Sequence, residues 1–278
     1  MSQAYYIAAH HKSYQFRWLF ASLYNESDLF LVHIDRKACE AFEADCAAAI
    51  GAAPNVIVLP RMDVNWGGWS QVKSELSAMR LALRAEQRWS YFVNLSGQDY
   101  PIQSRSHIQR SLEQAWPRSF IRVWSHEQVR STDPLDPHLA NRVSVELFGK
   151  VKSFPLRFPP SPGKLAYKGS QWHALSREFC SWVTSDLVAR RLAGRLRFSL
   201  CPDEVFFQAA IMNSPFMHQR MSDCGRLFFF PGPRVLGVAD LTAILDSDNL
   251  FARKFDSRVD RDVLIEIARN RGFPILDG

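Results

Sequence analysis

The sequence predicts an α/β protein whose N-terminal part is a parallel sheet covered by helices. Short apolar runs at residues 4–9, 28–34 and 55–59 have the length and composition of buried strands. Helical patterns at residues 14–24 and 39–50 lie between them. Strands and helices that alternate at this spacing indicate parallel pairing, because each helix carries the chain back across the sheet.

The same alternation continues into the middle of the chain. Ser70 is a suitable N-cap for a long amphipathic helix over residues 71–88. A fourth buried strand is expected at 89–95, then a helix at 107–114 and a strand at 119–124. Residues 125–165 are rich in proline and are predicted to form an irregular excursion with few elements of its own. Order resumes at 167–175, followed by helices at 177–190, 203–212, 240–245 and 260–269 and a strand at 226–230.

The composition is that of a globular protein with a sizeable core. The chain has 278 residues, of which 47% are hydrophobic and 22% charged, enough for one large domain or two small ones. The net charge of +6 suits a phosphate-bearing ligand, an anionic membrane surface or nucleic acid, and does not choose among them. The five cysteines include no C-x-x-C pair, which predicts free thiols and a reducing compartment. Without a signal-peptide pattern or an apolar run of membrane-spanning length, a cytoplasmic protein is expected.

Polar side chains follow the first two predicted strands. His10 comes after the first, and Asp35 with Arg36 after the second. Ligands of parallel α/β sheets bind beyond the carboxyl ends of the strands, so Asp35 and Arg36 are candidates for holding a nucleobase or ribose. The alternative is that these polar residues simply mark where the chain leaves the core. The sequence has neither G-x-G-x-x-G after the first strand nor a P-loop, the phosphate-binding devices of dinucleotide-binding proteins and P-loop enzymes.

Two further stretches carry residues suited to sugar chemistry. Residues 66–69 (WGGW) place two aromatic faces beside two glycines, which suits stacking on a sugar or simply a loop pinned by two aromatics. Residues 200–208 (LCPDEVFFQ) place Asp203 and Glu204 at the start of an apolar helix. Proline suits the first helical position and acids suit the first turn, so the two carboxylates are either a helix start or a general base held at a pocket.

Six stretches in order resemble one family. They are 32–37 (VHIDRK), 66–70 (WGGWS), 94–102 (NLSGQDYPI), 168–172 (KGSQW), 202–207 (PDEVFF) and 250–256 (LFARKFD). Together they resemble the core-2/I-branching β-1,6-N-acetylglucosaminyltransferases, a family that also contains the peptide O-xylosyltransferases. The resemblance implies a GT-A glycosyltransferase fold, with a Rossmann-like nucleotide-sugar half and a mixed central sheet flanked by helices. It also implies a UDP-sugar donor, inversion at the anomeric carbon and a reaction that needs no metal.

The residues agree with the absence of a metal. A metal-dependent GT-A enzyme places Asp-x-Asp after a buried strand, whereas residues 96–99 (SGQD) hold one acid, and the strings at 246–248 and 260–262 come late, in capping or loop contexts. No metal or other cofactor is therefore expected. The resemblance assigns the charge that stabilises departing UDP to Lys254 and Arg253, which would otherwise be interpreted as an ordinary exposed pair.

The resemblance also implies roles for the other residues. Glu204 would be the catalytic base, with Asp203 orienting the base region or contacting the acceptor. The remaining candidates form a donor side, with His10, Asp35, Arg36 and Asp99, and a sugar and acceptor side, with Trp66, Gly67, Gly169, Ser170, Gln171 and Trp172.

These expectations define an inverting, metal-independent glycosyltransferase occupying one domain over residues 1–278. Its nucleotide-sugar half would span about 1–124, and its acceptor-binding and catalytic half about 125–278. The donor sugar would be N-acetylglucosamine or xylose. The acceptor would be a bacterial surface glycan or glycolipid, and nucleic acid is not an expected partner. The site would be cytoplasmic, and peripheral association with the inner membrane stays open.

Two other functions fit parts of the sequence. A glycoside hydrolase needs two carboxylates on opposite sides of one bond, about 5–9 Å apart, so Glu204 or Asp203 would require a distant partner such as Asp99. A non-enzymatic glycan- or nucleic-acid-binding protein fits the basic stretch 140–168 and the eight tryptophans, although no nucleic-acid-binding motif is present.

Overall fold

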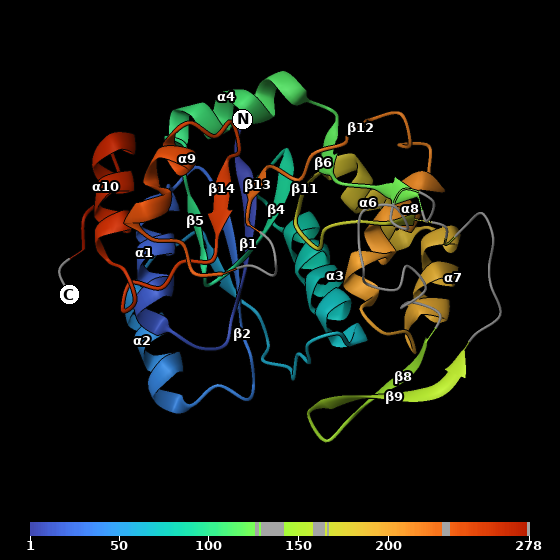
Figure 1. The fold of residues 1–278 in the computed structure, drawn as a ribbon. Coiled ribbons are helices and arrows are strands. Elements are labelled where there is room, and N and C mark those ends of the chain that lie inside the picture. The colour runs from blue at the N-terminus through green and yellow to red at the C-terminus, as the bar shows by residue number, and fades with distance from the viewer. Residues whose placement is uncertain (126–127, 129–141, 158–164, 166, 230–233, 277–278) are drawn as a thin grey trace. The chain divides into compact units, whose positions relative to one another are not determined.

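A computed structural model describes residues 1–125, 128, 142–157, 165, 167–229 and 234–276 (Figure 1). The chain divides into two compact units, and each is assembled from separate stretches. Unit one comprises Met1–Arg61, Gln87–Trp116 and Gly225–Gly278, and unit two comprises Met62–Glu86 and Pro117–Cys224. The two predicted halves meet once, near residue 124, whereas these units interleave along the chain.

Unit one contains most of the predicted parallel sheet. Its strands are β1 (Gln3–Ala9), β2 (Leu29–Ile34), β3 (Val56–Val58), β4 (Tyr91–Ser96), β5 (Asp99–Pro101), β13 (Arg226–Leu227) and β14 (Phe251–Arg253). Its helices are α1 (Ser13–Leu23), α2 (Glu40–Ile50), α4 (Arg105–Ala115), α9 (Leu241–Leu245) and α10 (Asp262–Arg271), with a 3-10 turn at Val238–Asp240.

Strand β1 is the centre of the sheet in unit one. It pairs in parallel with β2 on one side and β4 on the other, and β2 pairs in parallel with β3. Tyr5 and Ile7 are almost fully buried, as expected for a strand covered on both faces. The predicted order of strand and helix in residues 1–60 is therefore confirmed, and the carboxyl ends of β1, β2 and β4 lie along one edge.

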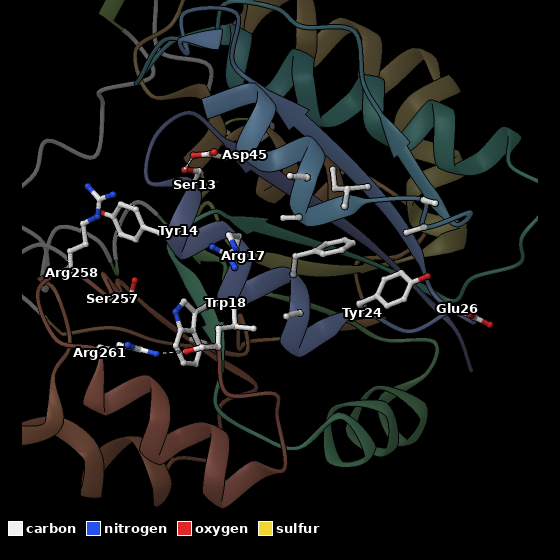
Figure 2. A pocket seen from close by; sticks show the side chains of 18 of the residues that line it. Ser13, Tyr14, Arg17, Trp18, Tyr24, Glu26, Asp45, Ser257, Arg258 and Arg261 are labelled. Carbon is white, nitrogen blue, oxygen red and sulfur yellow. Dashed lines mark hydrogen bonds between the residues drawn. The ribbon is translucent and has the colours of Figure 1, made fainter. Parts of the chain in front are cut away.

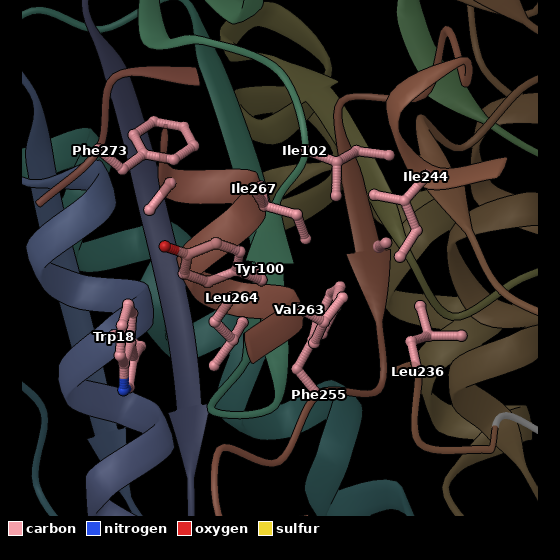
Figure 3. Close-up of a cluster of buried hydrophobic side chains, with 12 residues drawn as sticks. Trp18, Tyr100, Ile102, Leu236, Ile244, Phe255, Val263, Leu264, Ile267 and Phe273 are labelled. Carbon is pink, nitrogen blue, oxygen red and sulfur yellow. The ribbon is translucent and has the colours of Figure 1, made fainter. Parts of the chain in front are cut away.

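A second, smaller sheet in unit one has the order β13-β14-β5. Strand β14 pairs antiparallel with β5, so residues near 100 and near 252 are neighbours although about 150 positions separate them in the sequence. An apolar cluster packs on these strands and on α10 (Figure 3). Within it, the Tyr100 ring makes edge contacts with Trp18, Phe255 and Phe273, at centroid distances of 6.4, 5.7 and 6.0 Å.

Unit two has a mixed sheet and several helices. Its strands are β6 (Ser119–Ile121), β7 (Trp124–Ser125), β8 (Arg142–Leu147), β9 (Lys150–Arg157), β10 (Tyr167–Lys168), β11 (His173–Ser176) and β12 (Arg220–Met221). Its helices are α3 (Trp69–Arg84), α6 (Arg177–Ser185), α7 (Leu187–Leu196) and α8 (Phe206–Met212), with a 3-10 turn at Pro202–Glu204. Strand β6 pairs antiparallel with β11 and parallel with β12. A mixed sheet with flanking helices confirms the predicted α/β class.

Several local predictions differ from the structure. The expected irregular excursion contains an antiparallel hairpin, β8 with β9, while its residues 129–141 and 158–164 lie outside the described residues. The helix expected at 177–190 is two helices, because Asp186 ends α6 and caps α7 by accepting a hydrogen bond from the Val188 N–H at 2.7 Å. The strand expected at 226–230 is described only as Arg226–Leu227.

Two expectations about the whole chain can be compared with the structure. All five cysteines are free thiols, as predicted. Within the described residues, no helix combines the length and the apolar character needed to span a bilayer.

Candidate active site

The predicted donor-side residues lie in unit one, at the carboxyl edge of its parallel sheet. His10 follows β1, Asp35 follows β2, and the turn before Asp99 follows β4. Because β1 is paired in parallel with both other strands, these three strand ends meet at one edge. The Asp35 N–H donates to the Ala9 carbonyl at 2.9 Å, which joins two of the strand ends directly.

The loop after β2 is held by its own polar groups. Asp35 is buried, and its Oδ1 accepts from the Lys37 N–H at 2.8 Å while its Oδ2 lies 3.6 Å from Lys37 Nζ. Arg61, which follows β3, donates to the carbonyls of Asp35, Arg36 and Ala38 at 3.1, 3.1 and 2.8 Å. Arg36 itself is exposed. Sequence reasoning did not assign Arg61, although its position just beyond a strand end was a usable signal.

His10 reaches the surface at the same edge. The protein atoms around its ring desolvate it, and together with the neighbouring His11 they lower the pKa of His10 to about 4. The ring is therefore neutral near pH 7, with one nitrogen able to donate and one able to accept a hydrogen bond. The His11 ring lies at a centroid distance of 4.0 Å.

Asp99 is fully buried and faces arginines. It is the register partner of Arg253 across β5 and β14, and Arg253 Nη1 lies 3.7 Å from its Oδ2. Arg226 Nε lies 3.8 Å from its Oδ1. The Asp99 carboxylate therefore lies close to two buried guanidinium groups, those of Arg226 and Arg253. The alternative interpretation of Arg253 and Lys254 as an ordinary exposed pair does not hold for Arg253, since only 8% of the residue is accessible.

Lys254 carries a positive charge beside this buried cluster. Partial burial lowers the pKa of Lys254, and the charges of Arg253 and Lys12 lower it further. Lys12 follows β1 and pairs with Asp256, with 2.7 Å between Nζ and Oδ2. Like charges whose interaction lowers the pKa of Lys254 favour binding of an anion nearby. Lys12 was not among the predicted site residues.

The predicted carboxylates lie in unit two, in the 3-10 turn Pro202–Glu204. The expectation that they open an α-helix was wrong in detail, because α8 begins only at Phe206. Pro202 does occupy the start of the turn, as predicted. Asp203 is buried and its Oδ2 accepts from Gln71 Nε2 at 3.3 Å, whereas the Glu204 side chain is 35% exposed.

The two neighbouring acids therefore differ in environment. Burial raises the pKa of Asp203 to about 7, with a further contribution from the charge of Glu204. Glu204 is accessible and paired with Lys168, whose Nζ lies 3.3 Å from its Oε2. Lys168 is itself buried, so its ammonium has little freedom and fixes the direction of the Glu204 carboxylate. An accessible, oriented carboxylate is the better candidate for a base.

The 168–172 stretch is built against this turn. The Gly169 N–H donates to the Glu204 carbonyl at 2.9 Å. A Cβ at Gly169 would lie 1.8 Å from the Arg122 carbonyl oxygen, so the backbone needs glycine here. Gln208 Nε2 donates to the Ser170 carbonyl at 2.7 Å. These contacts connect two stretches that the sequence analysis named separately.

The tryptophan loop is fastened to the same turn. The Cys201 N–H donates to the Gly67 carbonyl at 2.9 Å, and the Gly67 N–H donates to Gln71 Oε1 at 2.6 Å. Gln71 thus links the loop to Asp203, a role that sequence reasoning missed. Trp66 is 83% exposed and presents an accessible aromatic face.

The other predicted aromatic residue lies in the 168–172 stretch. Trp172 is half-buried, and its N–H donates to Ser170 Oγ at 3.3 Å. Gln171, between them, is also half-buried. The structure therefore gathers the predicted sugar and acceptor residues around the Pro202–Glu204 turn, all within unit two.

A cavity of about 1150 Å³ lies elsewhere in unit one, between α1, α2 and the segment 257–261 (Figure 2). Arg258 and Arg261 line it, and their guanidinium groups lie over the rings of Tyr14 and Trp18. None of the predicted site residues lines this cavity. Within the described part of the chain, no group of three or more His, Cys, Asp or Glu residues is arranged to hold a metal ion.

Unit one carries cations at a strand-end edge, which suit an anionic, phosphate-bearing ligand, and unit two carries an oriented, accessible carboxylate. Residues 3–224 match the family model for the Core-2/I-branching enzyme, and the chain belongs to that family. The predicted family is therefore confirmed, and the chain is a glycosyltransferase with the predicted α/β fold. The match ends before Arg253 and Lys254.

Curated relatives bear the same family's names. The chain is 25% identical to a β-1,3-galactosyl-O-glycosyl-glycoprotein β-1,6-N-acetylglucosaminyltransferase 3 of Ovis aries, over 94% of this chain and 65% of the relative. It is 27% identical to an N-acetyllactosaminide β-1,6-N-acetylglucosaminyl-transferase of Mus musculus, over 91% of this chain and 68% of the relative. The chain thus spans about two thirds of the length of these relatives.

A distant likeness to solved structures also exists. The mouse xyloside xylosyltransferase 1 aligns with 12% identity and a TM-score of 0.43, over 91% of this chain and 97% of that one. This likeness is too weak to bear on the donor or the acceptor.

Proposed function

We propose that this chain transfers N-acetylglucosamine from UDP to a hydroxyl of a glycan, with inversion and without a metal, and that xylose is the alternative donor sugar. Family membership supports transfer of a sugar. The names of the curated relatives favour N-acetylglucosamine as the donor sugar. A bacterial surface glycan or glycolipid as the acceptor, and a cytoplasmic site of action, remain predictions.

The observation that carries the metal-free proposal is the environment of Asp99. Asp99 follows a buried strand, at the position where metal-dependent GT-A enzymes carry their Asp-x-Asp motif. Here its charge faces Arg226 and Arg253, at 3.8 and 3.7 Å. A carboxylate already balanced by two guanidinium groups is a poor ligand for a divalent cation, because the cation would have to displace them in a buried place.

The leaving group then takes its stabilisation from side chains. Lys254 follows Arg253 in the chain, and Lys254 and Lys12 both keep ammonium groups that are only partly buried. An ammonium aimed at a departing diphosphate oxygen lowers the barrier as charge develops there. Of the two residues that the resemblance assigned to this role, Lys254 is the one we propose to contact UDP, and Arg253 supports it by holding Asp99.

Glu204 supplies the base in this proposal. As the acceptor oxygen forms its bond to the anomeric carbon, the bond from that carbon to UDP breaks, and Glu204 takes the hydroxyl proton. One base suffices, because UDP leaves as an anion and needs no proton. Asp203 is buried and accepts a hydrogen bond from Gln71, so it is suited to holding the turn rather than to reaching the acceptor hydroxyl. Trp66 provides an exposed aromatic face for an acceptor sugar.

A donor screen tests the proposed function. The purified chain is incubated with UDP-N-acetylglucosamine, UDP-xylose, UDP-glucose and UDP-N-acetylgalactosamine in EDTA, with β-galactoside acceptors, and UDP release is measured. We expect acceptor-dependent release from UDP-N-acetylglucosamine, or else from UDP-xylose. Activity that appears only when Mn²⁺ replaces EDTA would overturn the metal-free mechanism, and release from none of the donors under either condition would overturn the proposed donor class.

A further inference from the structure

The turn of the β8–β9 hairpin is an unusual place for a phenylalanine. Phe148 and Gly149 connect the strands, with φ angles of 52° and 74°. Two central residues with positive φ are the mark of a type I′ hairpin turn, whose first position favours Asn, Asp or Gly. Phenylalanine is disfavoured there by its Cβ and ring. Phe148 is also 95% exposed, so no packing within the described structure compensates for this conformation.

More apolar side chains share one face of this hairpin. Cross-strand pairing sets Leu147 opposite Lys150 and Val145 opposite Lys152, so these four side chains lie on one face. Phe154 and Leu156 lie farther along β9, where the register with β8 shifts, and both side chains are exposed. Leu147, Phe154 and Leu156 are 43%, 42% and 66% exposed. We call this set, with Phe148 at its end, the outer face.

The opposite face of the hairpin is anchored to unit two. Glu146 Oε1 accepts from the Ser70 N–H at 2.6 Å, and its Oε2 accepts from Asn65 Nδ2 at 2.7 Å. A Cβ at Gly68 would lie 2.5 Å from the Glu146 carboxyl carbon, which shows how closely the two segments approach. The Ser144 N–H also donates to the Phe198 carbonyl at 2.8 Å. Glu146 therefore makes its hydrogen bonds on the inner face of the hairpin. The charged side chains on the outer face are Lys150 and Lys152.

We propose that the outer face docks this enzyme on an anionic lipid bilayer. Exposed aromatic and aliphatic side chains interleaved with lysines suit the membrane interface, where the rings enter the acyl boundary and the ammonium groups reach the headgroups. Charge complementarity selects this occupant, because Lys150 and Lys152 sit among the apolar groups and residues 142–157 place no carboxylate on that face. Figure 1 shows the hairpin, β8 with β9, in yellow-green.

Vesicle co-sedimentation of the full chain tests this docking. We expect binding to phosphatidylcholine vesicles that contain phosphatidylglycerol, weaker binding to pure phosphatidylcholine, and loss at high salt. Phe148→Asn should weaken binding about tenfold or more, as expected for losing a buried ring. Each of Lys150→Gln and Lys152→Gln should weaken it about fivefold. Phe148→Asn should also leave the melting temperature unchanged or higher, because Asn tolerates the left-handed conformation.

Matched variants on the same unit provide the control. Leu187 is 64% exposed on α7 and Lys73 is exposed on α3, so Leu187→Gln and Lys73→Gln should bind vesicles like the unaltered chain. Failure of the unaltered chain to bind anionic vesicles would overturn the proposal, as would equal binding by the hairpin variants. Sedimentation velocity tests the alternative that a second copy of the chain binds the outer face. If Phe148→Asn dissociates a dimer and leaves vesicle binding intact, the outer face is a protein interface and the proposal is wrong.

Discussion

Asp99 and Arg253 are direct partners on neighbouring antiparallel strands, and Arg253 Nη1 lies 3.7 Å from Asp99 Oδ2. This pairing joins two of the six stretches, 94–102 and 250–256, that together carry the family resemblance. It also explains why only one cation of the Arg253–Lys254 pair is available to a ligand. Arg253 balances a buried acid, and in the proposed mechanism Lys254 is the cation that contacts the diphosphate.

Removing the Lys254 charge should weaken UDP binding. We expect Lys254→Gln to raise the dissociation constant of UDP about tenfold or more, the loss typical of one charge-assisted hydrogen bond. Isothermal titration with UDP in EDTA measures this. Arg269→Gln, which changes an exposed charge on α10 of the same unit, is the control and should leave the affinity unaltered. Equal UDP affinity in Lys254→Gln and the unaltered chain would argue against a phosphate contact.

Lys168 should act as a positioning residue for the base. Lys168→Gln removes the ion pair to Glu204, and we expect kcat to fall about tenfold while the dissociation constant of UDP stays the same. Lys168→Arg should restore part of the rate, because a guanidinium can also pair with the carboxylate. Steady-state kinetics with UDP titration separates the two effects. A change in UDP affinity without a change in kcat would contradict this role.

Gly169 should tolerate no side chain. The Cβ of Gly169→Ala would collide with the backbone carbonyl of Arg122, which cannot rotate away, so we expect a loss of at least about 2 kcal/mol in the free energy of unfolding. Gly194→Ala is the matched control, since a Cβ there meets nothing within 4 Å and the helix should gain about 0.5–1 kcal/mol. Urea unfolding of both variants measures the difference, and similar stabilities would refute the close approach.

The buried Asp203 should make stability depend on pH. Its folded pKa is about 7 against an ordinary value of 3.8, so the folded chain holds a proton that the unfolded chain releases. The stability contributed by this protonated carboxyl is complete below about pH 4 and is lost as the pH rises through about 7. The amide introduced by Asp203→Asn does not titrate in this range. The melting temperature of the variant, relative to that of the unaltered chain, should therefore rise from about pH 5 to about pH 8. A constant difference across that range would show that Asp203 does not titrate there.

Local patterns predicted the elements near the N-terminus well, because β1 and β2 are apolar runs bounded by polar turns. They also predicted a helical start at Pro202, although residues 202–204 form a 3-10 turn and α8 begins only at Phe206. They could not show that Asp99 and Arg253 pair, because strand pairing across about 150 residues leaves no local signal. The contact between Gln71 and Asp203 could not be predicted either, because the two residues lie far apart in the sequence.

The hairpin was missed for a different reason. Its strands contain Lys, Ser, Glu and Pro as well as Val, and one face is exposed, so β8 and β9 lack the apolar composition of a buried strand. Phe148–Gly149 does not look like a turn in the sequence, because phenylalanine is rarely found with positive φ. In contrast, Asp186 was a usable N-cap signal that divided one predicted helix into α6 and α7.

The most direct test of the account is UDP release by the unaltered chain and by Glu204→Gln, compared in EDTA with the donor that the screen identifies and a glycan acceptor. We predict that Glu204→Gln loses acceptor-dependent release by about a hundredfold or more, as expected for removal of a general base, while UDP binds both proteins with equal affinity. A Glu204→Gln variant that transfers sugar at the rate of the unaltered chain would contradict Glu204 as the base.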